Sequence, residues 1–327
     1  MTGAEARRRL LAGLRVSARR VDAGGVSTAL LEGGSGSPLL LLHGGIECGG
    51  AYWAPVIPRL VENHRVVVPD APGLGESEPL ARLDDETFAH WLRDLIRLTC
   101  DARPTLVAHS LFGTGAALFA AAHGDSLSRL IVYAAPGIGR YRMLLRLRIV
   151  AVNFALRPNE RSGERFERFA LADRELTRRR DPAWFDAFSA YVLSRARVPH
   201  VKRTMSTLVK AGTTRVPDAE LQRIGIPVAL LWGRHDRMTP LPLAEAASTR
   251  LGWPLHVVDD AAHVPHIEQP GGFVDRLAEA LRTEGCELPL RAKQHAGTTA
   301  PLHGNQRARP GVTRAAAGTP SVSYAAG

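Results

Sequence analysis

Cysteine is scarce in this sequence, and long apolar runs are missing from it. The 327 residues contain only Cys48, Cys100 and Cys286, with no C-x-x-C spacing. This odd, widely spaced set argues against a disulfide framework or a zinc site and predicts a reducing, cytoplasmic compartment. Residues 1–20 carry arginines without a sustained apolar segment after them, which argues against a secretory signal. The run PLLLL at residues 38–42 is far too short to cross a bilayer, so we expect no stable membrane anchor.

Acidic residues are outnumbered, but only in parts of the chain. The net charge is +10, and residues 139–223 contain 19 Lys and Arg against 9 Asp and Glu. Aromatic residues are not interleaved with this charge, and no basic recognition helix is evident. We therefore interpret it as solvated helical faces and expect no nucleic-acid partner. Residues 140–157, RYRMLLRLRIVAVNFALR, suit either a helix over a pocket or one lying at a membrane surface.

Short apolar runs indicate the fold. Residues 17–32 read as two strands separated by the turn residues Gly24 and Gly25. Six further runs each lead into a loop: PLLLLHG, HRVVVPDAPG, TLVAHS, RLIVYAAPG, PVALLWGRHD and LHVVDDAAH. Runs without alternation are typical of strands buried on both faces of a parallel sheet. We expect helices at residues 51–62, 84–100, 111–123, 241–251 and 272–283. The alternation predicts an α/β fold with a mostly parallel eight-stranded sheet.

The strand pattern is interrupted in the middle of the chain. Residues 137–223 show helical spacing throughout, and we interpret them as a helical cap over the sheet edge where ligands bind. Residues 17–136 and 224–285 then form the α/β core. Residues 1–16 are a basic N-terminal extension, and the composition of residues 286–327 predicts a disordered tail.

Ser110 stands at the junction between an expected strand and an expected helix, in TLVAHSLFGTGAALFAAAHG. This is the context of a nucleophile elbow, the sharp turn that exposes a reactive serine. The alternative is a helix N-cap. Small neighbours are needed at such a turn; Ala108 meets this need, whereas Phe112 does not, and Gly113 or Gly115 would have to supply the close packing.

A reactive serine needs a base, an acid that orients the base, and donors for the oxyanion. His263 and Asp236 follow expected strands, and the order Ser110, Asp236, His263 is that of a catalytic triad on this architecture. The backbone N–H groups of Gly45 and Leu111 are the candidate oxyanion hole.

Other side chains compete for these roles. His266 is a second candidate base, and Asp259 and Asp260 are candidate acids that suit a turn better. We expect Asp70 to shape its own loop and His43 to be a structural histidine.

Five segments together resemble the α/β-hydrolase fold, specifically its lidded branch of esterases and carbon–carbon bond hydrolases. They are HGG with Trp53, DAPGLGES, AHSLFG, WGRHDRMTP and DDAAHVPHIEQP. The resemblance covers roughly residues 20–285. It implies a cofactor-free and metal-free serine hydrolase. We expect a small, apolar acyl substrate, with a carboxylic ester favoured.

The lining of the pocket and two other functions are less sharply indicated. Phe112, Trp184 and Phe188 are candidate pocket residues, although packing within the cap explains the aromatic cluster equally well. The same triad would also serve a carbon–carbon bond hydrolase of ring-fission diketones. A catalytically silent ligand-binding protein of this fold is the alternative outside enzymes.

Overall fold

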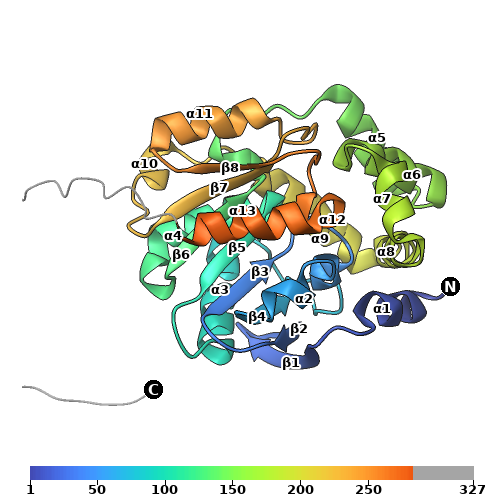
Figure 1. Cartoon of the computed structure of the whole chain (residues 1–327), viewed down its shortest axis with the longest axis horizontal. Coiled ribbons are helices and arrows are strands. Elements are labelled where there is room, and N and C mark those ends of the chain that lie inside the picture. Colours follow the sequence, from blue (N-terminus) through green and yellow to red (C-terminus); the bar gives the residue numbers. More distant parts are fainter. Residues whose placement is uncertain (283–327) are drawn as a thin grey trace, which may run out of the picture. The chain divides into compact units, whose positions relative to one another are not determined.

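The apolar runs become the strands of one sheet. The computed structural model describes residues 1–282. The eight strands run in the spatial order β1-β2-β4-β3-β5-β6-β7-β8, as Figure 1 shows in part. Their bounds are β1 (Ser17–Ala23), β2 (Val26–Gly33), β3 (Pro38–Leu42), β4 (Arg65–Pro69), β5 (Thr105–His109), β6 (Arg129–Tyr133), β7 (Val228–Gly233) and β8 (Leu255–Val258). The prediction of an eight-stranded, mostly parallel sheet is confirmed.

The sheet is antiparallel at one edge and parallel elsewhere. β1 pairs with β2 and β2 with β4 in antiparallel fashion, and all other neighbours are parallel. The first hairpin turns at Gly24 and Gly25, whose φ angles of 56° and 74° suit a two-residue turn that favours glycine. β3 and β7 are buried along their whole length, because parallel strands of this kind are covered on both faces.

Helices cover the sheet on both sides (Figure 1). One expected helix, at residues 51–62, is wrong: the chain forms a 3₁₀ turn and then a single helical turn. Pro55 lies between the two pieces and lacks the N–H that a continuous helix would use. The helical elements of the core are η1 (Gly49–Trp53), α2 (Ile57–Leu60), α3 (Asp85–Thr99), α4 (Ser110–His123), η2 (Gly124–Ser126), η3 (Pro136–Ile138), α11 (Leu241–Leu251), α12 (Pro265–Glu268) and α13 (Pro270–Arg282).

Six helices lie between β6 and β7 in the chain, and we call them the cap. The backbone of Ala170 accepts a 2.9 Å hydrogen bond from the N–H of His263, and Gly212 lies against Leu111 at the start of α4. The cap therefore lies over the end of the sheet where β5 passes into α4. Its helices are α5 (Leu145–Leu156), α6 (Glu160–Ala170), α7 (Arg174–Arg180), α8 (Pro182–Ala196), α9 (Pro199–Gly212) and α10 (Asp218–Leu221).

The N-terminal segment forms a helix, α1 (Gly3–Leu11), that packs against α8 of the cap. Ala6 and Leu10 are its buried residues, and Thr2 and Glu5 cap its first turn reciprocally. The sequence indicated only a basic extension here. The predicted tail, residues 286–327, lies outside the described residues.

Candidate active site

Ser110 occupies the turn between β5 and α4 in a left-handed backbone conformation, with φ of 51°. A side chain held in this region costs about 1–3 kcal/mol, which the surrounding packing must offset. Oγ of Ser110 lies 3.0 Å from Nε2 of His263. The N-cap position of α4 is held by His109, and Ser110 is the first residue of the helix. The N-cap alternative is therefore excluded, and the conformation is the one expected of a nucleophile elbow.

Gly113, not residue 112, supplies the close approach between strand and helix. A Cβ added at Gly113 would lie 2.8 Å from Cβ of Ala135 and 2.9 Å from the carbonyl oxygen of Ala108. Phe112 is buried, packing beside Phe88 and edge-on to His43 with ring centroids 5.6 and 5.4 Å apart. The bulky ring thus fills the core beneath the elbow.

His263 joins the serine to a carboxylate. Its Nδ1 lies 2.8 Å from Oδ2 of Asp236, which follows β7, while His263 itself lies between β8 and α12. Asp236 is held by further donors: Oδ2 accepts the Thr239 hydroxyl at 2.7 Å, and Oδ1 accepts the backbone N–H groups of Met238 and Thr239 at 2.8 Å each. Both Asp236 and His263 are buried. The structure therefore brings the three predicted residues into one hydrogen-bonded chain.

The rival side chains lie elsewhere. Nδ1 of His266 lies 2.9 Å from the hydroxyl oxygen of Tyr133, with which it is hydrogen-bonded. Asp259 is exposed and pairs with Arg234. Asp70 accepts the backbone N–H of Glu76 in its own loop at 2.8 Å and that of Gly50 in η1 at 2.5 Å, so it shapes its loop and also ties it to η1.

The loop after β3 passes close to the serine. A Cβ at Gly44 would come within 3.2 Å of Cβ of Ser110, and one at Gly45 within 2.5 Å of the Leu111 side chain. His43 is neutral and structural: its Nε2 accepts a backbone N–H at 2.9 Å, and burial lowers its pKa to about 4. The N–H of Leu111 belongs to the first turn of α4, where helical donors lack intrahelical partners.

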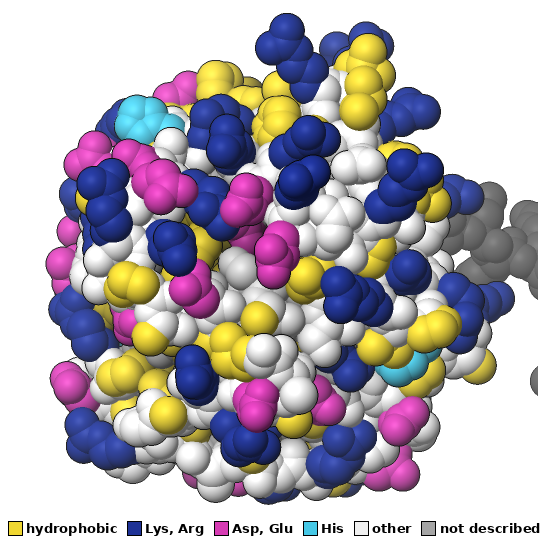
Figure 2. Space-filling view, turned by 90° about the vertical axis from the view of Figure 1, so that its right-hand side faces the viewer, with side chains coloured by type: hydrophobic (Ala, Val, Ile, Leu, Met, Phe, Trp, Pro, Cys, Tyr) yellow, Lys and Arg dark blue, Asp and Glu magenta, His cyan; other side chains and the backbone are white. Residues whose placement is uncertain are grey.

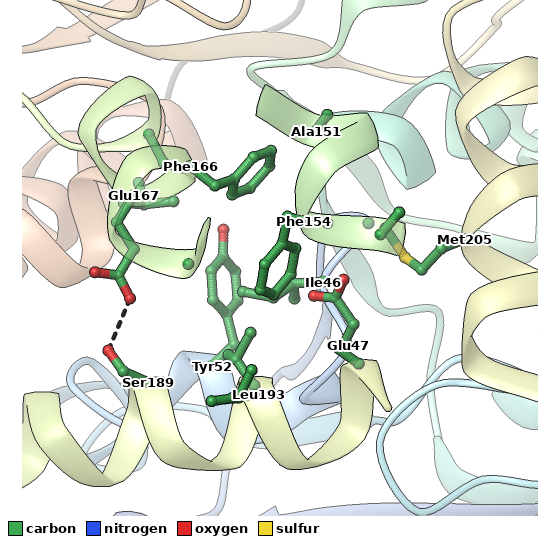
Figure 3. A pocket seen from close by; sticks show the side chains of 18 of the residues that line it. Ile46, Glu47, Tyr52, Ala151, Phe154, Phe166, Glu167, Ser189, Leu193 and Met205 are labelled. Carbon is green, nitrogen blue, oxygen red and sulfur yellow. Dashed lines mark hydrogen bonds between the residues drawn. The ribbon is translucent and has the colours of Figure 1, made fainter. Parts of the chain in front are cut away.

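A cavity of about 1300 Å³ is lined by Ser110 and by residues of the cap. Figure 3 shows part of its lining, including Phe154 and Phe166 of the cap. Ser110 and His263 open onto it, and Phe188 lines it as predicted. The prediction that Phe112 and Trp184 line it is wrong: Phe112 turns into the core, and Trp184 stacks against Phe188 at 5.2 Å instead. Its lining includes the apolar and aromatic residues Ile46, Tyr52, Leu111, Tyr141, Leu147 and Phe154.

Glu47 contributes an acidic group to this wall, two residues beyond the Gly45 backbone. Figure 3 shows its carboxylate beside Phe154. It forms no ion pair with residues 1–282, and burial raises its pKa to about 7. Near neutral pH, Glu47 therefore favours neutral hydrogen-bonding groups over anions in its vicinity.

His109 is a site residue that sequence reasoning missed. Its Nε2 donates to the carbonyl oxygen of His263 at 3.0 Å, and its Nδ1 accepts the Tyr52 hydroxyl at 2.8 Å. These partners assign the tautomer, since a carbonyl only accepts. Burial, with His263 nearby, keeps the pKa of His109 well below its usual value. His109 thus holds the backbone of His263 as a neutral donor.

Glu268 was missed as well. It is 2% exposed, and its two oxygens accept the N–H groups of Ala262 at 2.6 Å and of Ala172 in the cap at 2.5 Å. The carboxylate therefore links the cap to the residue before His263. Burial raises its pKa to about 7.

Replacing Glu268 by glutamine is expected to change how stability depends on pH. The pKa is higher in the folded state than its ordinary value of 4.5, so the unfolded chain loses this proton first as pH rises. As the pH rises from about 4.5 to 7, ionisation of Glu268 lowers the free energy of unfolding by about 3 kcal/mol. Glutamine does not ionise, so the free energy of unfolding of the variant should not fall in this way. Urea unfolding at pH 5 and pH 8 measures it.

The glutamine also places an amide NH₂ against one of the two backbone donors. We therefore expect the free energy of unfolding at pH 5 to be about 1–3 kcal/mol lower in the variant than in the wild type. Exposed Glu62→Gln is the matched control. An equal difference between Glu268→Gln and the wild type at both pH values would contradict the raised pKa.

The fold and the geometry define a class of protein. The family model of the alpha/beta hydrolase fold matches residues 37–270. The chain belongs to this family, and it is an α/β hydrolase.

Three similar proteins are themselves hydrolases. A 2-hydroxy-6-oxo-6-(2'-aminophenyl)hexa-2,4-dienoic acid hydrolase of Metapseudomonas resinovorans is 24% identical over 273 residues, 80% of this chain and 90% of that protein. The structure of a 2-hydroxy-6-oxo-6-phenylhexa-2,4-dienoate hydrolase of Rhodococcus sp. strain RHA1 matches with a TM-score of 0.72 and 21% identity, covering 83% of this chain and all of the other. A carboxylesterase of Bacillus subtilis matches with a TM-score of 0.71 and 22% identity, covering 86% and 97%.

Proposed function

We propose that the protein is a serine hydrolase that cleaves a small carboxylic ester through an acyl-enzyme. The observation that carries the proposal is the hydrogen-bonded chain from Ser110 through His263 to Asp236, which opens onto the cavity. A hydroxyl becomes a competent nucleophile only when an oriented base receives its proton. The hydrogen bonds from Ser110 to His263 and from His263 to Asp236 meet that requirement.

The proposed reaction uses each of these groups in turn. Ser110 Oγ attacks the ester carbonyl carbon while its proton passes to Nε2 of His263, and Asp236 stabilises the imidazolium through Nδ1. The backbone N–H groups of Gly45 and Leu111 stabilise the oxyanion. The tetrahedral intermediate then collapses: the alcohol leaves with the proton from His263, and the acyl group stays on Ser110. Water, deprotonated by His263, releases the acid and restores the serine.

The cavity wall supports an apolar acyl group. Leu111, Tyr141 and Leu147 line the cavity that Ser110 opens onto, and Phe188 adds an aromatic ring from the cap. The acidic Glu47 disfavours a carboxylate close to the oxyanion loop, since it has no cationic partner within residues 1–282.

A second candidate is hydrolysis of a carbon–carbon bond in a ring-fission diketone. The similarity to the Metapseudomonas resinovorans hydrolase over 80% of this chain supports it. Lys202 also lines the cavity, where it could pair with a substrate carboxylate. The two candidates share the triad and differ in the group that leaves.

A panel of nitrophenyl esters, from acetate to decanoate, tests the first candidate beside a ring-fission dienoate. We expect kcat/KM to rise with acyl length by at most roughly fourfold per methylene, because each buried CH₂ is worth about 0.8 kcal/mol. Glu47→Gln should improve turnover of the dienoate more than that of the esters. Turnover of the dienoate alone would instead establish the second candidate.

A further inference from the structure

Helix α5 presents a stripe of large apolar side chains to solvent. Leu145, Ile149, Val152 and Leu156 are 69%, 59%, 50% and 73% exposed, and Leu144, which precedes the helix, is 53% exposed. The spacing of four, three and four residues places the four helical ones on one face. We call these five residues the α5 stripe. An exposed apolar patch of this kind marks an interaction surface.

The opposite face of the same helix is already occupied. Leu147 and Phe154 are 1% and 5% exposed and line the cavity, and the lining continues through Ala151 and Ala155 to Val152 at the edge of the stripe. Helix α5 therefore carries apolar side chains on its buried face and on its exposed face. This pattern is typical of a helix that packs against something on each face. Residues 1–282 cover only one of them.

The charge around the stripe identifies what fits it. Residues 139–159 contain no Asp or Glu. The arginines in this segment are exposed, and the ion pairs found within residues 1–282 include none of them: Arg140, Arg142, Arg146, Arg148 and Arg157. On the side of the molecule that carries α5, Figure 2 shows dark-blue side chains standing among yellow ones near the upper edge.

We propose that α5 docks reversibly on the surface of an anionic lipid bilayer. The α5 stripe would enter the boundary between headgroups and acyl chains, and the flanking arginines would meet lipid phosphates. A second copy of the chain fits less well, because a symmetric contact through this face would bring two unpaired sets of arginines together. No helix of residues 1–282 is long and apolar enough to cross a membrane, so the contact is peripheral.

Docking would place the cavity at the lipid surface. Helix α5 is only twelve residues long, and Val152 of the stripe also lines the cavity, so the stripe borders the cavity. An apolar compound dissolved in the bilayer could then reach the cavity past α5 without crossing bulk water. This step does not depend on which bond the protein hydrolyses.

Co-sedimentation of the full chain with vesicles tests the proposal. We expect binding to vesicles of phosphatidylglycerol with phosphatidylcholine, and binding to phosphatidylcholine alone that is weaker by at least about tenfold. The triple variant Leu145→Gln, Ile149→Gln, Leu156→Gln should lose at least about tenfold in affinity for the mixed vesicles. Arg142→Gln and Arg146→Gln should each lose roughly fivefold, as expected for one basic residue at such a surface.

Matched variants away from α5 serve as controls. Leu98→Gln on α3 and Leu176→Gln on α7 replace leucines that are 38% and 46% exposed, and Arg93→Gln removes an exposed arginine of α3. Their vesicle affinity should equal that of the wild type. The triple variant should retain the wild-type unfolding temperature, because the residues it changes are mostly exposed.

Several outcomes would overturn the proposal. These are an absence of sedimentation with mixed vesicles, equal binding to the two vesicle types, or stripe variants that bind like the wild type. Sedimentation velocity supplies a further one. If the wild type is a dimer that the triple variant converts to a monomer, and vesicles bind neither, the stripe joins two copies of the chain.

Discussion

Ser110→Ala is expected to lower kcat for the best nitrophenyl ester by at least about 10³-fold. The variant lacks the oxygen that His263 Nε2 meets at 3.0 Å, while the loop after β3 and the start of α4 keep their backbone donors. KM should change little, because the hydroxyl contributes to the transition state more than to substrate binding. Alanine has the same left-handed backbone cost as serine, so the unfolding temperature should stay close to that of the wild type.

A fluorophosphonate probe separates a silent ligand-binding protein from an enzyme. The wild type should be labelled, and Ser110→Ala should not. Ser206→Ala is the matched control, since this second serine also lines the cavity, from the cap. Labelling that persists in Ser110→Ala, or a wild type that reacts with neither probe nor esters, would remove Ser110 from the mechanism.

The parts of the site that sequence reasoning placed correctly share one property. Ser110, Asp236 and His263 each follow a strand that is recognisable from a short apolar run, and parallel strands bring their carboxyl ends to one edge. The local context of each residue and the topology of the sheet were therefore sufficient to predict that these three side chains meet.

Side-chain direction was not predictable in the same way. Phe112 and Leu111 are neighbours in the sequence. Because successive side chains point in different directions around α4, Phe112 lies in the core and Leu111 lines the cavity. Trp184 and Phe188 share a face of α8, and their stacking decides that only Phe188 meets the cavity. Helical phase relative to a neighbouring element is a tertiary property, which the local pattern does not contain.

The missed residues depend on partners distant in sequence. His109 acts on the carbonyl of His263, 154 residues away, and Glu268 accepts the N–H of Ala172, 96 residues away. The packing of α1 likewise depends on α8. The sequence shows only a glutamate shortly after His263, at the end of α12, and its role emerges only when the cap is in place.

Asp236→Asn is expected to lower kcat by about 10⁴-fold while leaving the fold intact. In the wild type, Oδ1 accepts two backbone N–H groups, so in the variant the amide oxygen keeps this position. The amide NH₂ then faces Nδ1 of His263 and donates to it. The imidazole must carry its proton on Nε2, which points at Ser110 and can no longer accept the serine proton.

The neighbouring Thr239 keeps the variant folded. Its hydroxyl lies 2.7 Å from Oδ2 of Asp236 and 3.1 Å from the carbonyl oxygen of Ala134, so it can donate to Ala134 and accept from the new amide. The unfolding temperature should therefore shift much less than the rate. Asp259→Asn, an exposed acid four residues before His263, is the control and should retain wild-type kcat. A kcat for Asp236→Asn within about tenfold of the wild type would mean that the tautomer of His263 does not limit the reaction, and the assignment of Asp236 would fail.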